Sequence, residues 1–173
     1  MATPALTSVG SVEFVAGYAG QIADLGPDPQ IETRVNEAAT AIDFGVAVTR
    51  GTAVTGGVGK CKVLNTNGQV PIGITVRQAS TQIASTDGNN TINYPQYDDV
   101  PILKDGVIWA LPFEDVVEGD GVIALPAQNG KLGGTTAGAA NGTSRMAFDG
   151  AVWLQTQTAA SGLPARIRIK NRV

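Results

Sequence analysis

The sequence predicts an all-β fold, on the basis of its short apolar segments, its turn residues and its lack of helical periodicity. Across most of the 173 residues, apolar or β-branched segments of roughly four to eight residues alternate with turn signals, as strands and their connections do. Asx-Gly pairs adopt the positive φ angles of tight hairpin turns with little strain. Seven such pairs are present: Asn67-Gly68, Asp87-Gly88, Asp105-Gly106, Asp120-Gly121, Asn129-Gly130, Asn141-Gly142 and Asp149-Gly150.

The N-terminal region is expected to form an extended arm over residues 1–30, followed by a β domain over residues 31–173. The first 12 residues carry no charged side chain and are rich in Ala, Thr, Ser and Gly, so they cannot bury a core of their own. The segment from Phe14 to Ile22 is apolar but interrupted by glycines, and the prolines that follow it break any regular element. We expect this stretch to cross a surface or to thread between elements.

The β domain begins with a segment whose sequence fits two kinds of regular structure. Ile31, Thr33 and Val35 alternate with polar residues, which is typical of a half-buried strand. The alanine content of Glu32–Asp43 suits a short helix instead, and we favour the strand. Further strands are expected at Phe44–Val48, Cys61–Leu64 and Ile72–Val76.

Three later segments share one form, a turn followed by a β-branched strand: Asp105–Leu111, Asp120–Leu125 and Asp149–Leu154. An internal duplication would explain the similarity, but a turn before a β-branched run also arises by convergence, which we favour. The polar stretch Ser80–Tyr97 is expected to form an exposed loop or hairpin tip, and Gly133–Ser144 a flexible loop.

Composition excludes several classes of function. A net charge of −3 and a pI of about 4.8 provide no positive field to attract nucleic acid or anionic lipid. The longest apolar runs are about seven residues, whereas a membrane helix needs roughly 20, so we expect neither nucleic acid nor membrane as a partner. The absence of histidine removes the commonest general base and metal ligand. The single Cys61 has no partner for a disulfide or a zinc site.

Two patterns resemble catalytic or ligand-binding sites but depart from them. The segment Val54–Cys61 is similar to a phosphate-binding loop, yet its first position should be Gly, its last Ser or Thr, and a helix should follow. Carboxylates concentrated between Asp98 and Asp120 could bind calcium or hydrolyse glycosides, but the calcium-loop spacing and the aromatic platforms for sugars are missing. Solvated charges on loops and edge strands explain them better. We therefore predict a non-enzymatic protein with no metal, cofactor or small-molecule substrate.

The C-terminal segment alternates cations with mostly apolar residues, so a β-strand there would place the cations on one face. These cations are Arg166, Arg168, Lys170 and Arg172. A strip for nucleic acid would need interleaved aromatic residues, and a simply solvated face is a second possibility. We favour a third, in which the strand docks against an acidic surface on a neighbouring subunit or shell protein.

Aromatic residues extend this candidate interface. Trp109 and Trp153 follow their Asp-Gly pairs at the same offset and could form a stacking platform, but tryptophans in strands more often pack in a core or a subunit interface. The predicted interface residues are Phe14, Tyr18, Ile22, Trp109, Trp153, Arg166, Arg168 and Lys170.

Five stretches carry a resemblance to a known family: Val15–Asp24, Ala41–Gly51, Asp105–Trp109, Gly119–Ile123 and Ala151–Ile169. In their pattern and order they resemble the structural cement, or capsid decoration, proteins of tailed bacteriophage heads. They span most of the chain, and Gly56–Gln96 is the least similar part.

The resemblance implies a small β-barrel or β-sandwich with an extended N-terminal arm, assembled as a homotrimer on the outer surface of the phage head. There the protein would bind the major capsid protein at junctions between its subunits and clamp the shell against internal DNA pressure. It would be a virion structural protein made in the cytoplasm of the bacterial host. The main alternative is a subunit of a phage fibre, spike or other surface assembly. A β-fold enzyme acting through carboxylates and an oligonucleotide-binding barrel are further alternatives.

Overall fold

The structure is a computed structural model, and it describes residues 17–24, 29–53, 57–78, 93–135 and 145–170. Within these ranges the regular elements are β-strands and short 3-10 turns, with no α-helix, which confirms the all-β prediction. None of the described segments forms a helix with the length and hydrophobicity of a membrane span.

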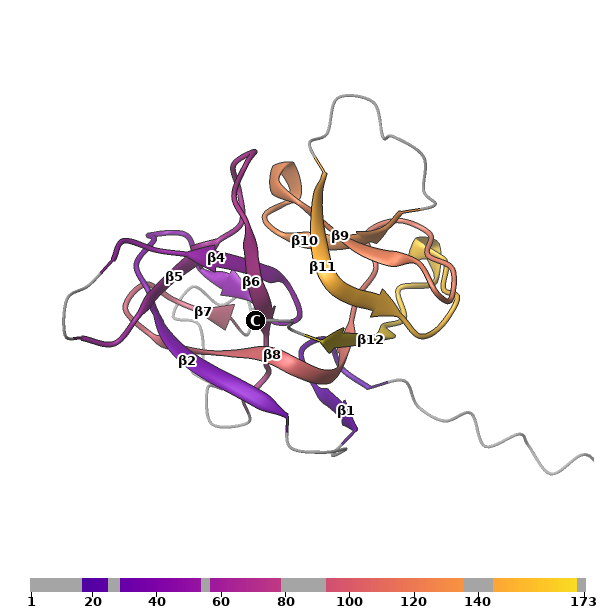
Figure 1. Cartoon of the computed structure of the whole chain (residues 1–173), viewed down its shortest axis with the longest axis horizontal. Coiled ribbons are helices and arrows are strands. Elements are labelled where there is room, and N and C mark those ends of the chain that lie inside the picture. The colour runs from indigo at the N-terminus through magenta and orange to yellow at the C-terminus, as the bar shows by residue number, and fades with distance from the viewer. Residues whose placement is uncertain (1–16, 25–28, 54–56, 79–92, 136–144, 171–173) are drawn as a thin grey trace, which may run out of the picture.

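A mixed β-barrel forms one half of the molecule (Figure 1). In order around the ring its strands are the first half of β8 (Asp99–Ala110), β2 (Gln30–Asn36), β5 (Lys60–Val63), β4 (Ala47–Arg50) and β6 (Pro71–Thr75). The ring closes because β6 returns to β8 through the pairs Ile74 with Leu103 and Thr75 with Ile102. Neighbouring strands are antiparallel except β2 and β5, which run parallel.

The second half of β8 leaves the barrel and enters a second lobe (Figure 1). From the outer edge inward, this antiparallel sheet contains β10 (Lys131–Gly134), β9 (Gly121–Leu125), β11 (Met146–Trp153), β12 (Ala165–Lys170) and then β8. The smaller elements are β1 (Ile22–Asp24), which pairs with β8, the pair β3 (Ile42–Asp43) and β7 (Asn93–Tyr94), and the 3-10 turns η2 (Pro126–Gln128) and η3 (Ala159–Ser161). One long strand thus belongs to both lobes.

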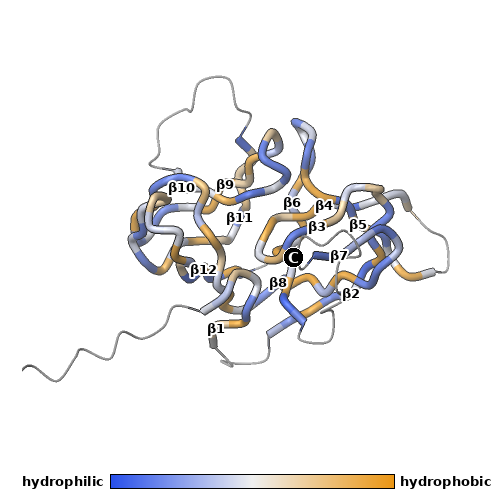
Figure 2. The backbone as a smooth tube through the Cα atoms, turned by 180° about the vertical axis from the view of Figure 1, so that it is seen from behind, coloured by the Kyte–Doolittle hydropathy of each residue, from blue (hydrophilic) through white to orange (hydrophobic). Residues whose placement is uncertain are grey.

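Two hydrophobic clusters stabilise this arrangement, and hydrophobic stretches follow the strands of both lobes in Figure 2. The barrel cluster includes Val48, Cys61, Val63, Tyr94, Val100 and Ile102. The second cluster joins Ala47, Ile74 and Leu103 of the barrel to Ile108, Leu132, Trp153 and Ile167 of the second lobe. Each fully buried aliphatic side chain contributes about 1.5–3 kcal/mol. The two lobes therefore pack as one body.

Most of the predicted strands are confirmed. β2 forms where the strand was favoured over a helix, and β5 and β6 lie within one residue of their predicted positions. The strand predicted from Phe44 is present but its predicted start was wrong, because the chain turns at Phe44 and Gly45 and β4 covers only Ala47–Arg50. Gly45 has a φ of +71°, which a continuous strand cannot contain.

The Asx-Gly pairs serve two structural purposes. Asn67-Gly68 and Asn129-Gly130 lie in turns as predicted, and Asp120-Gly121 follows a turn closed by the Asp120 N–H and the Val117 carbonyl. Asp105-Gly106 and Asp149-Gly150 were wrongly predicted as turns, because they lie inside β8 and β11. Gly106 and Gly150 have φ angles of +132° and +77°, and the pairing register shifts beside both, as in β-bulges. Asp87-Gly88 and Asn141-Gly142 lie outside the described residues.

Two predicted loops also contain strand. Gly133 and Gly134 belong to β10, and Asn93 and Tyr94 form β7. Residues 80–92 and 136–144 of these loops lie outside the described residues.

Candidate interaction surface

The first described segment, Gly17–Asp24, lies across the junction of the two lobes, and we call it the strap. The N–H of Gly20 donates to the carbonyl of Trp109 in β8 at 2.8 Å, and its carbonyl accepts from the N–H of Arg77, just after β6, at 2.7 Å. The Trp109 N–H donates to the carbonyl of Gln21 at 2.8 Å, and β1 extends this pairing along β8. The strap therefore ties the end of a barrel strand to the second lobe.

Two glycines allow the strap to lie this close to the body. A Cβ atom on Gly17 would lie 2.3 Å from Cδ1 of Trp109, and one on Gly20 would lie 2.9 Å from Cβ of Phe44. Gly20 also has a φ of +81°, which side-chain-bearing residues rarely adopt. The glycines that interrupt this apolar segment in the sequence are thus required by close backbone packing.

A groove of about 760 Å³ lies where the strap and the two lobes meet. Its lining includes Tyr18 from the strap, Phe44 and Arg77 from the barrel, and Leu111, Phe113 and Lys131 from the second lobe. Tyr18 is 64% exposed, Leu111 48% and Phe113 42%. Large apolar side chains gathered in an open groove are typical of a surface that binds a partner.

Two cations lie over aromatic rings in this groove. The guanidinium carbon of Arg77 is 4.8 Å from the centre of the Tyr18 ring, and Nζ of Lys131 is 5.3 Å from that of Phe113. Among the residues that the structure describes, neither cation has a carboxylate within ion-pair distance, although Asp43 also lines the groove. The groove therefore offers apolar surface beside two positive charges that can attract a partner's carboxylate.

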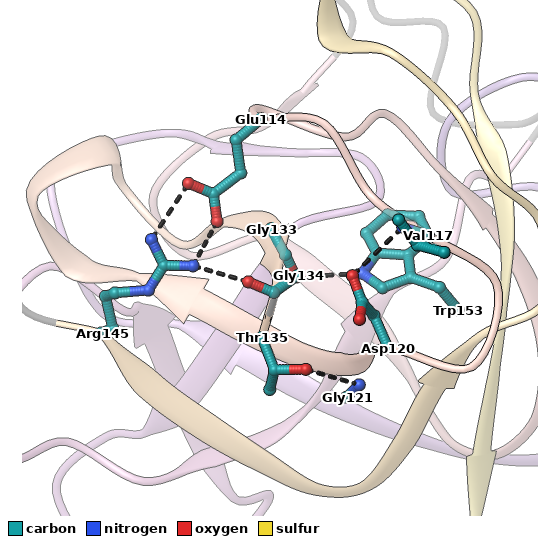
Figure 3. A network of polar contacts seen from close by, with 9 residues as sticks. All are labelled: Glu114, Val117, Asp120, Gly121, Gly133, Gly134, Thr135, Arg145 and Trp153. Atoms are coloured by element: carbon teal, nitrogen blue, oxygen red, sulfur yellow. Dashed lines mark hydrogen bonds and ion pairs between the residues drawn. The ribbon is translucent and has the colours of Figure 1, made fainter. Parts of the chain in front are cut away.

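An ion pair fixes the part of the second lobe that carries Phe113 (Figure 3). Both guanidinium nitrogens of Arg145 contact the Glu114 carboxylate, one of them from Nη1 to Oε2 at 3.0 Å, and Nη2 also donates to the carbonyl of Gly134 at 2.6 Å. A Cβ atom on Gly133 would lie 2.0 Å from Oε1 of Glu114. Gly133 of β10 therefore makes room for the partly buried Glu114 carboxylate.

Two further hydrogen bonds attach the same region to the core. Nε1–H of Trp153 donates to the carbonyl of Gly133 at 2.9 Å (Figure 3), and the N–H of Phe113 donates to the carbonyl of Leu132 at 2.8 Å. The second lobe thus holds its part of the groove through buried groups rather than through surface contacts alone.

The cations of β12 form a second exposed surface, which we call the basic strip: Arg166, Arg168 and Lys170. The intervening residues Ala165, Ile167 and Ile169 are buried, which confirms the predicted alternation. Arg168 and Lys170 are exposed, whereas Arg166 is half-buried, pairs with Trp109 across the sheet and lies with its guanidinium carbon 5.8 Å from that ring. Arg172 lies outside the described residues.

The other predicted interface residues lie in different environments. Tyr18 is in the groove, Ile22 is half-buried in β1 against β8, and Phe14 lies outside the described residues. Trp109 is half-buried between the strap and Arg166. Trp153 is completely buried in the core, so it has no surface to offer a partner and leaves the candidate interface.

Most of the groove could not be predicted from the sequence. Phe44 and Leu111 fall in segments predicted as strands, and Phe113, Arg77 and Lys131 carry no predicted role. Only Tyr18 had been singled out among the groove residues. The groove could not be recognised from the sequence because it depends on the position of the strap, which brings together residues that are far apart in the sequence.

The thiol of Cys61 is buried and unreactive. Cys61 lies buried in β5, where burial raises the pKa of its thiol to about 12. It therefore stays neutral and unreactive at ordinary pH. Its position in a strand also agrees with the prediction that no phosphate-binding helix follows Gly59. No group of three or more potential metal ligands occurs in the described ranges.

Comparison with known proteins identifies the family. The family model of the structural cement protein (E217 gp24/Pam3 gp6) matches residues 7–170. Among solved structures, a chain from "The capsid of Myoviridae Phage XM1" is similar over 98% of this chain and 100% of that chain, with a TM-score of 0.64 and 16% identity, which shows a shared fold. No curated protein matches the chain. Because the family match covers nearly the whole sequence, the resemblance is confirmed, and the chain belongs to the phage structural cement protein family.

Proposed function

We propose that the protein acts as a homotrimer on the outer surface of the phage head, where it bridges neighbouring major capsid subunits and stabilises the shell. Its family makes it a non-enzymatic structural component of the phage capsid. The observation that carries the proposal is the presence of two separate adhesive surfaces on one body, the groove and the basic strip.

The two surfaces suit different kinds of contact. The groove can bury apolar side chains and so supports a persistent contact, whereas Arg168 and Lys170 of the basic strip are exposed and suit attraction to an acidic surface. Linking several weak contacts in one trimer can raise the overall affinity by roughly 10²–10⁴ over that of a single contact. A trimer that touches more than one capsid subunit would therefore hold the shell together.

We further propose that residues 1–16 reach a neighbouring subunit. They carry Glu13 as their single charged side chain, with Phe14 beside it as the proposed anchor. The strap holds the adjoining Gly17 against Trp109, which fixes the point from which this segment departs. Deleting residues 2–16, which removes Phe14 but keeps Gly17 and the rest of the strap, should leave the thermal unfolding of the chain unchanged while the protein no longer stays on heads. Full retention of head binding would contradict this part of the proposal.

The central test measures oligomeric state and shell binding together. Size-exclusion chromatography with light scattering should give a trimer, and the trimer should co-sediment with heads that lack it. A monomer at every concentration would refute the trimer, and failure to co-sediment with any form of the head would refute the bridging role.

The basic strip has its own test. Arg168→Glu combined with Lys170→Glu should weaken head binding and reduce its dependence on salt, because exposed charge pairs are screened by salt. Arg166 is left unchanged because it also packs on Trp109. The matched control, Arg50→Glu with Lys62→Glu on barrel strands β4 and β5, changes the net charge equally. Equal loss of binding in both variants would show that total charge, and not the strip, matters.

A further inference from the structure

A tyrosine beside the start of β8 is exposed in an unusual backbone conformation. Tyr97 is 76% exposed, the largest value among the large hydrophobic residues of the described chain. Its φ is +70°, and Asn129 is the one other described non-glycine residue with a positive φ. Such a conformation costs of order 1 kcal/mol or more and persists where surrounding contacts hold it.

A buried asparagine supplies those contacts. Asn36 is completely buried, and its Nδ2 group donates to the carbonyls of Thr40, Tyr94 and Pro95 at 3.1, 3.1 and 3.2 Å. Its backbone carbonyl accepts from the N–H of Tyr97 at 2.8 Å. The loop is therefore held rigidly from the barrel side while the Tyr97 ring projects outward. An aromatic side chain on a rigid loop requires little backbone ordering on binding and is a frequent anchor of interfaces.

An exposed carboxylate lies close to the tyrosine in the sequence. Asp99, two residues after Tyr97, is exposed, whereas Oδ2 of Asp98 is buried. The Tyr97 loop thus presents an aromatic ring with negative charge beside it. The groove presents the complementary set, namely apolar and aromatic surface beside Arg77 and Lys131.

We propose that the Tyr97 loop of one copy inserts into the groove of a second copy. The inference rests on the proposed homotrimer and names the surfaces through which it forms. Tyr97 does not line the groove of its own chain, and the 12 residues of β8 separate the loop before the strand from Leu111 after it. A contact between two different patches of the same chain closes into a ring when the rotation between copies permits. Three such contacts would complete a trimer.

A charge swap tests the pairing. Tyr97→Gly removes the ring but keeps the backbone conformation without strain, and it should raise the dissociation constant of the oligomer at least about tenfold. Lys131→Glu and Asp99→Lys should each weaken assembly, and the double variant should recover much of the loss. Val70→Ala is the matched control, because Val70 is 69% exposed on another loop of the barrel. Sedimentation equilibrium measures each dissociation constant, and circular dichroism checks the fold.

Cross-linking tests the geometry directly. Oxidising a mixture of the Tyr97→Cys and Leu111→Cys variants should join unlike chains, and each variant alone should give little dimer. The natural Cys61 does not interfere, because it is buried with a thiol pKa of about 12. A predominance of like-with-like cross-links would overturn the proposal in favour of a two-fold contact.

The outcomes separate this inference from the proposed function. A trimer unaffected by Tyr97→Gly and by Lys131→Glu would overturn the pairing but leave the trimer standing. An intact trimer that loses head binding in Lys131→Glu would assign the groove to the shell protein and likewise overturn the pairing. A chain that never forms oligomers would refute both.

Discussion

The barrel and the second lobe protect their strand edges in different ways. In the barrel, β6 pairs back to β8, so the ring has no edge strand. In the second lobe, β10 is an edge strand, and the segment around Pro112 and Phe113 covers it through a bridge and a hydrogen bond to Leu132. Exposed edge strands can pair with other chains and cause aggregation. Barrel closure and the covering segment both prevent this.

Folding and assembly are coupled in the second lobe. The segment that covers β10 also lines the groove through Leu111 and Phe113, so the edge of the second lobe and the shape of the groove depend on the same residues. The barrel core contributes to the groove only through its rim. We therefore expect damage to the second lobe to reduce stability and to disturb the groove, whereas damage to the barrel core, which supports the Tyr97 loop but little of the groove, should reduce assembly less.

The largest expected effect is at the centre of the second lobe. Trp153→Ala should lower the free energy of unfolding by about 3–5 kcal/mol, since it leaves a large cavity and removes the hydrogen bond to Gly133. Ile102→Ala in the barrel should cost about 2–5 kcal/mol. Urea denaturation measures both. At a temperature where both variants are folded, Trp153→Ala should weaken the oligomer more than Ile102→Ala does, and equal weakening by the two variants would contradict the comparison.

The ion pair between Arg145 and Glu114 is expected to have the second-largest effect. Arg145→Met should destabilise the protein by about 2 kcal/mol, because Glu114 keeps a partly buried charge without its partner. Hydrogen exchange should speed up for the amides of β10 and stay unchanged for those of β4 and β5. Equally faster hydrogen exchange in both lobes would show that they unfold together and that the ion pair does not stabilise the second lobe selectively.

The strap provides a smaller and more selective effect. Gly17→Ala places a methyl group in the space of the Trp109 ring and should cost about 1–3 kcal/mol, with a larger proportional loss of head binding, because the strap lines the groove. Gly68→Ala is the control: it meets no atom within 4 Å but has a φ of +83°, so it should cost about 1–2 kcal/mol without altering binding. Equal head binding by the two variants would show that the strap does not contribute to assembly.

The smallest effect concerns a surface ion pair of the barrel. Burial tends to raise the pKa of Glu32, but its contacts with Lys104 at 2.8 Å and with Arg34 outweigh burial and lower the pKa from its ordinary value of 4.5. The stability gained is therefore present above pH 4.5 and is lost as the pH falls through the lowered pKa. Because Glu32 is partly exposed, Glu32→Gln should cost less than about 1 kcal/mol at pH 7. In chemical denaturation, that difference should shrink in acid; a difference that persists there would have another cause.

Several features of the fold could be predicted from neighbouring residues alone. The alternation in β12 placed Ile167 and Ile169 inside and the cations outside, since side chains of a strand point to opposite faces in turn. Asn67-Gly68 formed a turn for an equally local reason. The same dipeptide signal failed at Asp105-Gly106, because a positive φ suits a bulge inside a paired strand as well as a turn, and only the partner strand decides between them.

Residue patterns along the chain were enough to predict an all-β fold, and the order of motifs pointed to the family that the comparison confirmed. These properties depend on residue type and on spacing along the chain. The tertiary structure alone decided that the groove exists, that Trp153 is internal and that Tyr97 projects from a rigid loop. The physical reason is that each depends on long-range contacts, such as Gly17 against Trp109 and Asn36 beneath Tyr97, whose partners lie far apart in the sequence and meet only when the sheets close.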